Sequence, residues 1–173
     1  MGLDVFAYKR LQPMPETDNR REWFMQVRNH QGHVTFSKDD IEDTEKDFPG
    51  RASGLVPGTY SWSSGHSFKV TYGGFDDWRS RLAQFAGGTS EKVWSGQHPS
   101  GMPFVELIKF YNNQGVIGPV VSAKLAADFV DNSRKYRNWL RSDGDQDFDD
   151  LSIYMDLTIA FLLAGDEGAI QFA

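Results

Sequence analysis

Apolar and polar residues alternate near both ends of the chain, as they do in half-buried β-strands. This pattern predicts strands at residues 3–8 and 169–172. Two similar segments, residues 23–27 and 33–36, flank residues 29–32, whose Asn and Gly are typical of a hairpin turn. The sequence therefore predicts a strand at each end and a hairpin in the first third of the chain.

After residue 36, prolines, glycines and an acidic segment separate the elements that the apolar pattern predicts. Residues 59–62 and 67–72 predict two strands that pair with each other across a Ser-Ser-Gly turn. Residues 37–47 are acidic and nearly devoid of apolar side chains, which is typical of a surface loop or a frayed helical turn. Residues 103–110 fit either a short strand or a turn of helix.

Three segments carry apolar residues at helical spacing. Residues 76–86 are the first, with two aspartates at the amino end and two glycines after the last turn. Residues 119–131 begin with a proline, which the first turn of a helix tolerates. Residues 149–163 are apolar on most sides, so we expect this helix at the centre of the core.

The order of these elements indicates the fold class. Strands come first, helices dominate later, and there is no regular strand–helix–strand alternation. The sequence therefore predicts an α+β fold with a mainly antiparallel sheet packed against about three helices. At 173 residues the chain fits a single domain over residues 1–173.

The amino-acid composition limits the cellular location and the kinds of site that can be expected. A hydrophobic content of 39% suffices for a packed core, and 14% of aromatic residues leaves room for a homo-oligomer. The absence of Cys excludes disulfides, thiolate metal ligands and a cysteine nucleophile. No signal peptide is recognisable, and the most apolar stretch, residues 157–164, is shorter than the ~20 residues of a membrane helix. We therefore expect a soluble, cytoplasmic protein with no membrane partner.

The formal net charge of −6 argues against duplex DNA or RNA as a partner. Proteins that bind a duplex normally carry a basic surplus, whereas this chain has 18 basic and 24 acidic residues. The charge is uneven, because residues 61–120 carry five basic and four acidic side chains and the flanking segments are acidic. This middle third is therefore where an anionic small ligand is least repelled.

Motifs for catalysis and metal binding are incomplete. Residues 143–147 resemble the start of a calcium loop, but Phe148 and Tyr154 stand where that loop needs Gly and Glu. The four histidines show no zinc-binding spacing. Residues 65–69 and 87–92 approach the serine-nucleophile and phosphate-loop motifs without matching either. The sequence therefore predicts no catalytic residue, no metal site and no cofactor.

One segment combines aromatic and basic side chains with glycines. A strand at residues 67–72 leads through a glycine turn into the helix near residue 76, and free N–H groups at a helix start favour anions. The residues expected to hold an anionic, aromatic molecule such as a nucleotide are Lys69, Tyr72, Gly73, Phe75, Trp78 and Arg79. The alternative is that Phe75 and Trp78 form a plain core stripe.

A second candidate segment is rich in side-chain amides. It places Phe110, Asn112, Asn113 and Gln114 in a glycine-bounded loop before a helix. Amides hydrogen-bond the edges of bases and sugars but exchange no proton at neutral pH, so they suit binding rather than catalysis. The alternative is a polar turn that caps the helix. The nucleotide hypothesis requires both segments to meet around one hollow.

Four short motifs extend over most of the chain. They are Met-Gly-Leu-Asp at residues 1–4, Gly-Leu-x-x-Gly-x-Tyr at residues 54–60, an aromatic and basic stretch at residues 68–79, and Glu-Leu-Ile-x-Phe with Gly-x-Ile-Gly-Pro within residues 106–119. In these motifs the chain resembles a family of uncharacterised proteins of bacteriophages and prophages. The resemblance implies an accessory protein that acts inside a bacterial host cell.

The chain departs from the family pattern where relatives tend to have acidic residues, because it has Asn112 and Gln114 there. If the relatives use those carboxylates in catalysis or metal binding, this member only binds. We therefore expect a non-enzymatic protein that sequesters a small nucleotide-like molecule, such as a host immune signal. The alternative is an inhibitor that blocks a host protein through an acidic, aromatic-rich surface. A hydrolase or nuclease built from scattered carboxylates ranks third.

Overall fold

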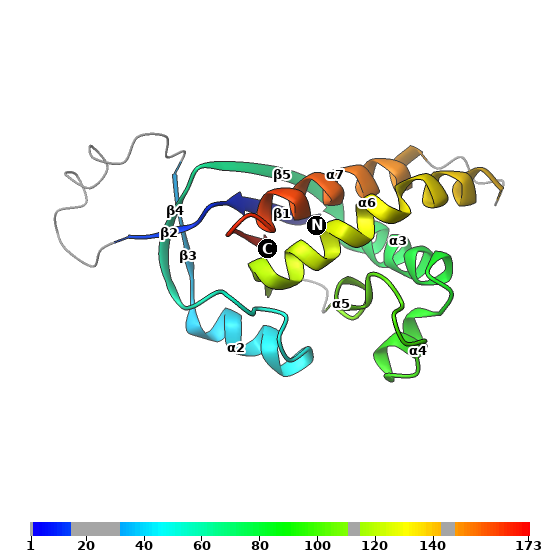
Figure 1. The fold of residues 1–173 in the computed structure, drawn as a ribbon, viewed down its shortest axis with the longest axis horizontal. Coiled ribbons are helices and arrows are strands. Elements are labelled where there is room, and N and C mark those ends of the chain that lie inside the picture. The colour runs from blue at the N-terminus through cyan, green and yellow to red at the C-terminus, as the bar shows by residue number, and fades with distance from the viewer. Residues whose placement is uncertain (1, 15–31, 111–114, 143–147) are drawn as a thin grey trace.

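The computed structural model describes residues 2–14, 32–110, 115–142 and 148–173. In this part of the chain it has two antiparallel sheets and six helices, so the predicted α+β fold is confirmed (Figure 1). The strands are β1 (Gly2–Lys9), β2 (Gln12–Pro13), β3 (Gly32–Phe36), β4 (Gly58–Trp62), β5 (Ser64–Thr71), β6 (Gly115–Ile117) and β7 (Ala169–Phe172). The helices are α2 (Lys38–Asp47), α3 (Tyr72–Phe85), α4 (Ser90–Trp94), α5 (Val105–Ile108), α6 (Pro119–Ser142) and α7 (Phe148–Ala164).

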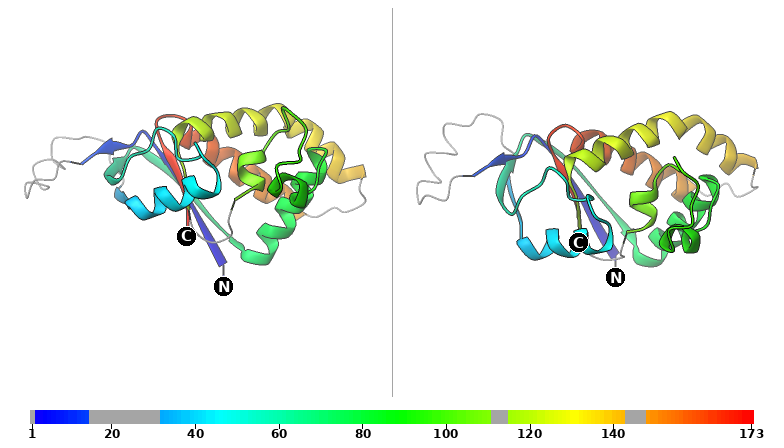
Figure 2. Two further views of the ribbon diagram at one scale, coloured as in Figure 1. Left: turned by 90° about the horizontal axis from the view of Figure 1, so that it is seen from below. Right: turned by 60° about the horizontal axis from the view of Figure 1, so that its bottom comes forward.

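The larger sheet has the strand order β5-β1-β7-β6, and every neighbouring pair is antiparallel. Leu3, Val5 and Ala7 of β1 alternate toward the core and are almost fully buried, which confirms the predicted first strand. Helices α6 and α7 form an antiparallel hairpin on this side, and α7 packs directly against β1 and β5 (Figure 2). The predicted last strand is confirmed as β7.

The smaller sheet has the order β2-β4-β3 and builds a second core cluster. Its members Val34, Phe36 and Tyr60 pack with Val116 of β6 and Ala169 of β7. β3 confirms the strand predicted at residues 33–36. The partner predicted for it, residues 23–27, lies outside the described residues, and within those described β3 pairs with β4.

The predicted pairing of residues 59–62 with residues 67–72 is wrong. β4 belongs to the smaller sheet and β5 to the larger one. At the crossing, the Ser63 N–H donates to the Lys9 carbonyl at 3.0 Å, which brings β5 alongside β1. Phe68 then lies opposite Val5. Pairing with β1 therefore joins apolar side chains on the core face, and burial sets the register more strongly than the short turn does.

Residues 37–47, expected as a loop or a frayed turn, form the ten-residue helix α2. A capping box starts it: Ser37 Oγ accepts a hydrogen bond from the Asp40 N–H at 3.0 Å, and Asp40 Oδ2 accepts one from the Ser37 N–H at 3.2 Å. Its buried residue is Thr44, whose hydroxyl accepts from the Val116 N–H at 3.1 Å. Capping and this tertiary hydrogen bond therefore replace the apolar stripe that the sequence lacks.

Helices α3, α6 and α7 confirm the three predicted helices and differ from them in extent, whereas α4 was not predicted. α6 continues to Ser142 rather than ending at residue 131, because Tyr136 and Leu140 extend its buried stripe. The Tyr136 ring stacks on Tyr154 of α7, with centroids 4.3 Å apart. Residues 103–110 contain the short helix α5. No helix in the described ranges is both long enough and apolar enough to cross a membrane.

Candidate functional site

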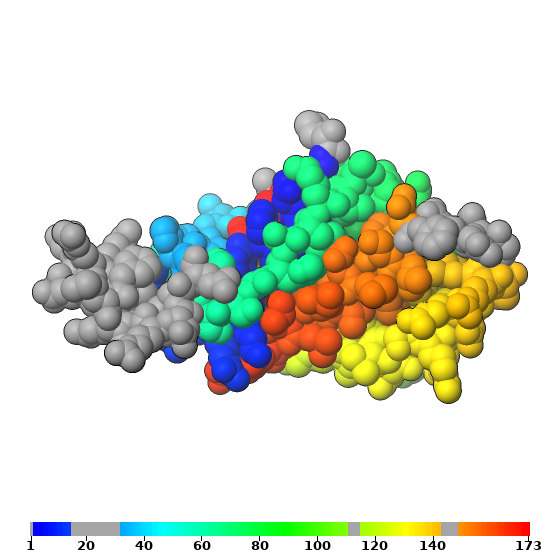
Figure 3. Space-filling view, turned by 90° about the horizontal axis from the view of Figure 1, so that it is seen from above, coloured from blue at the N-terminus to red at the C-terminus, as the bar shows by residue number. Residues whose placement is uncertain are grey.

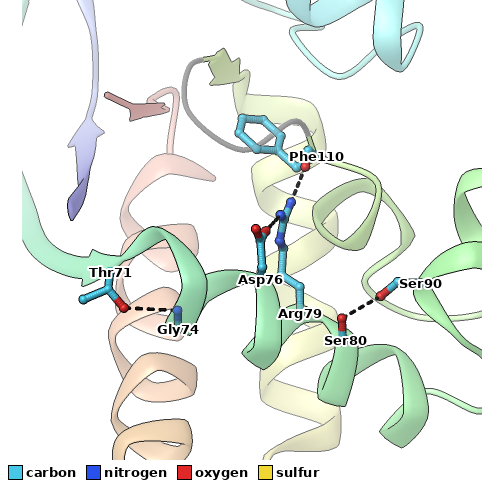
Figure 4. A network of polar contacts seen from close by, with 7 residues as sticks. All are labelled: Thr71, Gly74, Asp76, Arg79, Ser80, Ser90 and Phe110. Atoms are coloured by element: carbon cyan, nitrogen blue, oxygen red, sulfur yellow. Dashed lines mark hydrogen bonds and ion pairs between the residues drawn. The ribbon is translucent and has the colours of Figure 1, made fainter. Parts of the chain in front are cut away.

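The glycine turn predicted before α3 is part of the helix. α3 begins at Tyr72, so Gly73 and Gly74 lie in its first turn. Thr71 is the amino-terminal cap, and its hydroxyl accepts a hydrogen bond from the Gly74 N–H at 3.1 Å (Figure 4). One of the N–H groups expected to meet an anion is therefore already bonded within the protein.

The aromatic rings of this segment are in the interior. Phe75 and Trp78 are 1% and 0% exposed and stack with centroids 5.8 Å apart. The Trp78 Nε1–H donates to the Asp150 carbonyl at 3.2 Å. Tyr72 is half-buried against the same core, and Gly73 is exposed. The structure thus corrects the expectation for Phe75 and Trp78, because the core-stripe alternative describes them and neither presents a face to a ligand.

The two candidate segments do meet, at a buried contact between Arg79 and Phe110. The Arg79 guanidinium donates to the Phe110 carbonyl and pairs with Asp76 (Figure 4). It also lies over the Phe75 ring, 4.9 Å from the centroid. Burial lowers the pKa of Arg79, and the hydrogen bond and charge of Asp76 oppose that shift. Phe110 is 1% exposed and packs on Phe172, so neither residue is open to a ligand.

A second buried arginine, which the sequence analysis missed, holds the neighbouring carbonyl. Arg51 is 1% exposed, donates to the Lys109 carbonyl and lies between the rings of Phe48 and Phe110. Burial lowers its pKa to about 10. We call the set Arg51, Arg79 and Phe110 the arginine junction. It fixes the chain at the end of α5 and leaves no surface for binding.

The remaining predicted residues do not complete a nucleotide pocket in the described part of the chain. Lys69 is exposed and forms an ion pair with Asp4, its cross-strand neighbour, with Nζ and Oδ2 3.0 Å apart. Asn112, Asn113 and Gln114 lie outside the described residues. The shared hollow on which the nucleotide hypothesis depends is therefore not assembled from the residues that can be placed.

A groove of about 530 Å³ lies along β5 instead. Its walls are β5, the first turns of α3 and the amino-terminal half of α7, and Figure 3 shows β5 at the surface beside α7. We call it the β5 groove. The charged side chains that line it are Lys69, Asp77, Arg81, Asp149, Asp150 and Asp156. Only Lys69 was a predicted site residue.

The main chain of β5 is open on its outer side. β5 is the last strand of its sheet, and β1 is its partner within the described residues. On β1, Asp4 exchanges both main-chain hydrogen bonds with Ala173 on the β7 side, so the odd-numbered residues of β1 face β5. Their partners on β5 are even-numbered, such as Phe68. Ser67 and Lys69 therefore direct their N–H and C=O groups outward, along the free edge.

The β5 groove is acidic. Its two cations are already engaged, Lys69 with Asp4 and Arg81 with Asp150, where the nitrogen and oxygen are 3.1 Å apart. Asp77 and Asp149 are exposed to solvent. The Asp156 carboxylate accepts a hydrogen bond from His66 Nε2 at 3.0 Å. With four aspartates and two cationic side chains in its lining, the groove has an excess of negative charge that suits a cationic partner.

The groove offers main-chain and carboxylate groups for recognition. No group of three His, Asp or Glu residues within the described ranges is placed to hold a metal ion. The free edge supplies main-chain hydrogen bonds, and the carboxylates supply charge. Sequence reasoning missed the site because its carboxylates come from α3 and α7, which only the tertiary structure brings to one strand edge.

We compared the chain with protein-family models, with curated proteins and with solved structures. None of the three comparisons gave a significant match.

Proposed function

We propose that the protein is an interaction module that captures an extended, basic segment of another protein in the β5 groove. The observation that carries the proposal is a free strand edge inside an acidic groove. An exposed edge is a template for one more strand, and binding by strand addition uses main-chain hydrogen bonds for affinity and side-chain contacts for specificity.

The geometry of the strand edge determines which side chains of the bound segment contact the groove. Residues that pair with Ser67 and Lys69 form the main-chain hydrogen bonds and point away from α7. Residues between them lie beside Phe68 and Val70, on the face that α7 covers. Basic side chains at these alternate positions reach the carboxylates of α3 and α7. The preferred partner is therefore a segment with Lys or Arg at every second residue.

The acidic character of the whole chain supports the same partner. A net charge of −6 accelerates encounter with a basic partner and disfavours acidic competitors. The resemblance to phage proteins makes a basic protein of a bacterial host the natural candidate. The proposal keeps the acidic part of the predicted inhibitor surface. It does not keep the aromatic-rich part, because Phe68 is the one aromatic residue that lines the groove among the described residues.

Capture of a nucleotide stays a prediction. The rings that it needs for stacking are buried at Phe75, Trp78 and Phe110. The edge of β5, by contrast, already directs main-chain groups outward within the described part of the chain, so the interaction hypothesis has the stronger support.

A peptide titration tests the proposal. A labelled peptide of about ten residues, in which Lys alternates with Val, has the length and charge pattern for an added strand. Fluorescence anisotropy is expected to show saturable, salt-sensitive binding to the full chain. Two controls separate charge from strand addition: a Glu-Val peptide, and a Lys-Val peptide with Pro at alternate positions. Equal binding of all three, or no saturable binding of the first, would contradict the proposal.

A further inference from the structure

Helix α7 carries an apolar stripe on the side that faces away from the molecule. Met155, Ile159 and Leu162 are 53%, 44% and 53% exposed, although large apolar side chains are usually buried. Their spacing of four and three residues places them on one face of the helix. This face is opposite the core side chains, such as Leu157, which is fully buried. The sheet and α6 therefore leave this stripe open.

Helix α6 extends the same face. Val130 is 50% exposed, and it follows Phe129, whose carbonyl accepts a hydrogen bond from Tyr154 of α7 at 2.7 Å. Further along, Ala123 is exposed and packs against the backbone of Gly165, just beyond the end of α7. α6 and α7 thus lie side by side over this length, as in Figure 3. We call the exposed residues Ala123, Ala127, Val130, Met155, Ile159 and Leu162 the hairpin face.

The two ends of the hairpin face carry opposite charge. Beyond Val130, α6 exposes Arg134, Arg137 and Arg141, which continue the same side of the helix. At the other end Glu167 is exposed and lines a hollow of about 660 Å³ that Ala123 also lines. Asp166 beside it is paired with Lys9 and Arg10, so Glu167 is the anionic group that this end offers to a partner. A surface that is apolar in the middle, with arginines at one end and a glutamate at the other, is complementary to a copy of itself turned end for end.

The size of the surface also fits a second copy. At a rise of ~1.5 Å per residue the stretch from Ala123 to Arg141 is about 27 Å long, and two helices are about 20 Å wide. These dimensions give about 540 Å², close to the roughly 600 Å² per partner at the lower end of specific interfaces.

We propose that two copies of the chain associate through the hairpin face, with their α6–α7 hairpins antiparallel about a two-fold axis. The apolar stripe of each copy covers the stripe of the other. Arg134 and Arg137 of each copy approach Glu167 of the second copy. The inference does not depend on the β5 groove, because the groove lies on the β5 side of α7 and the stripe on its outer side.

Measurement of the mass in solution tests the interface. Light scattering of the full chain at micromolar concentration is expected to give twice the chain mass of 19.6 kDa. Ile159→Glu places two like charges in the contact and should weaken the dimer at least ~100-fold. Gln97→Glu is the control, since Gln97 is exposed just beyond α4 and lies outside the hairpin face, and it should leave the dimer unchanged. A monomeric wild type, or a dimer that survives Ile159→Glu, overturns the proposal.

A charge exchange tests the antiparallel arrangement. Arg134→Glu and Glu167→Arg should each weaken the dimer several-fold, and the double variant should recover most of the loss. Losses that simply add overturn the two-fold antiparallel geometry. Peptide binding to the monomeric Ile159→Glu variant should match that of the wild type. Failure of this interface is therefore distinguishable from failure of the groove.

Discussion

The arginine junction and the β5 groove contain similar residues, but the junction is buried and the groove is open to a partner. Both combine arginine, aspartate and aromatic rings near an end of α3 or α5. In the junction, Arg79 bonds a buried carbonyl and a neighbouring carboxylate, so its donors serve internal partners. Beside the groove, the outward N–H and C=O groups of Ser67 have no neighbouring strand on that side of the sheet within the described residues. A charged residue type therefore indicates function only after its internal partners have been identified.

This comparison predicts that the largest loss of stability comes from substitutions in the buried core beside the arginine junction. Trp78→Ala removes a fully buried ring and its hydrogen bond to Asp150, and should lower the free energy of unfolding by ~3–5 kcal/mol. Chemical denaturation with fluorescence or circular dichroism measures this. A loss below about 1 kcal/mol would mean that Trp78 is not part of a packed core.

A smaller loss is expected from Arg79→Met. The change keeps most of the side-chain volume but leaves the Phe110 carbonyl without its donor, so unfolding should become easier by roughly 2 kcal/mol. Lys92→Met is the control, because Lys92 is an exposed cation on the short helix α4. If Arg79 were a ligand residue, its replacement would change binding while leaving stability near that of the wild type.

In the groove, a single backbone change should act on binding and spare the fold. Ser67→Pro removes an outward N–H that β1 does not use, and proline is tolerated on edge strands. We expect affinity for the Lys-Val peptide to fall about tenfold, which corresponds to ~1.4 kcal/mol. Ser67→Ala keeps the N–H and should bind as the wild type does. Equal affinity of the Pro and Ala variants would exclude strand addition at this edge.

The smallest expected effect on peptide affinity comes from the exposed charges at the edge of the groove. Asp149→Asn should reduce peptide affinity only two- to fivefold, because Asp149 is exposed and its interaction is screened by solvent and salt. The reduction should shrink further at high salt. Asp131→Asn, on the exposed side of α6, is the matched control. An equal effect of both variants would point to net charge rather than to the groove.

Local patterns in the sequence predicted much of the fold. Alternation of apolar and polar residues identified β1, β3 and β7, and helical spacing of apolar residues identified α3, α6 and α7. In each of these segments one face is buried, so apolar residues recur with the period of the element. The extra turns of α6 and the whole of α2 were missed. Thr44 and Tyr136 show why: a buried hydroxyl or a ring that stacks on another helix does not mark the sequence as a stripe of aliphatic residues does.

The candidate site was much harder to predict than the fold. Sequence proximity favoured Tyr72, Phe75 and Trp78, which share one helix with a core side. The groove depends on Asp77 and Asp149 meeting across β5, and no local pattern records that meeting. Lys69, predicted to contact a ligand, lines the groove and forms an ion pair with Asp4 across the strands.

The sequence by itself determined the α+β class, the placement of most helices and strands, and the acidic balance of the chain. Only the tertiary structure decided that β5 pairs with β1 rather than with β4 and lies at the edge of its sheet. It also decided that Phe75 and Trp78 are buried, whereas the apolar stripe on α7 is exposed. The physical reason is that periodicity reports whether a residue has an apolar side to bury. Which element covers that side depends on long-range packing, and so does the choice of which edges and faces remain for a partner.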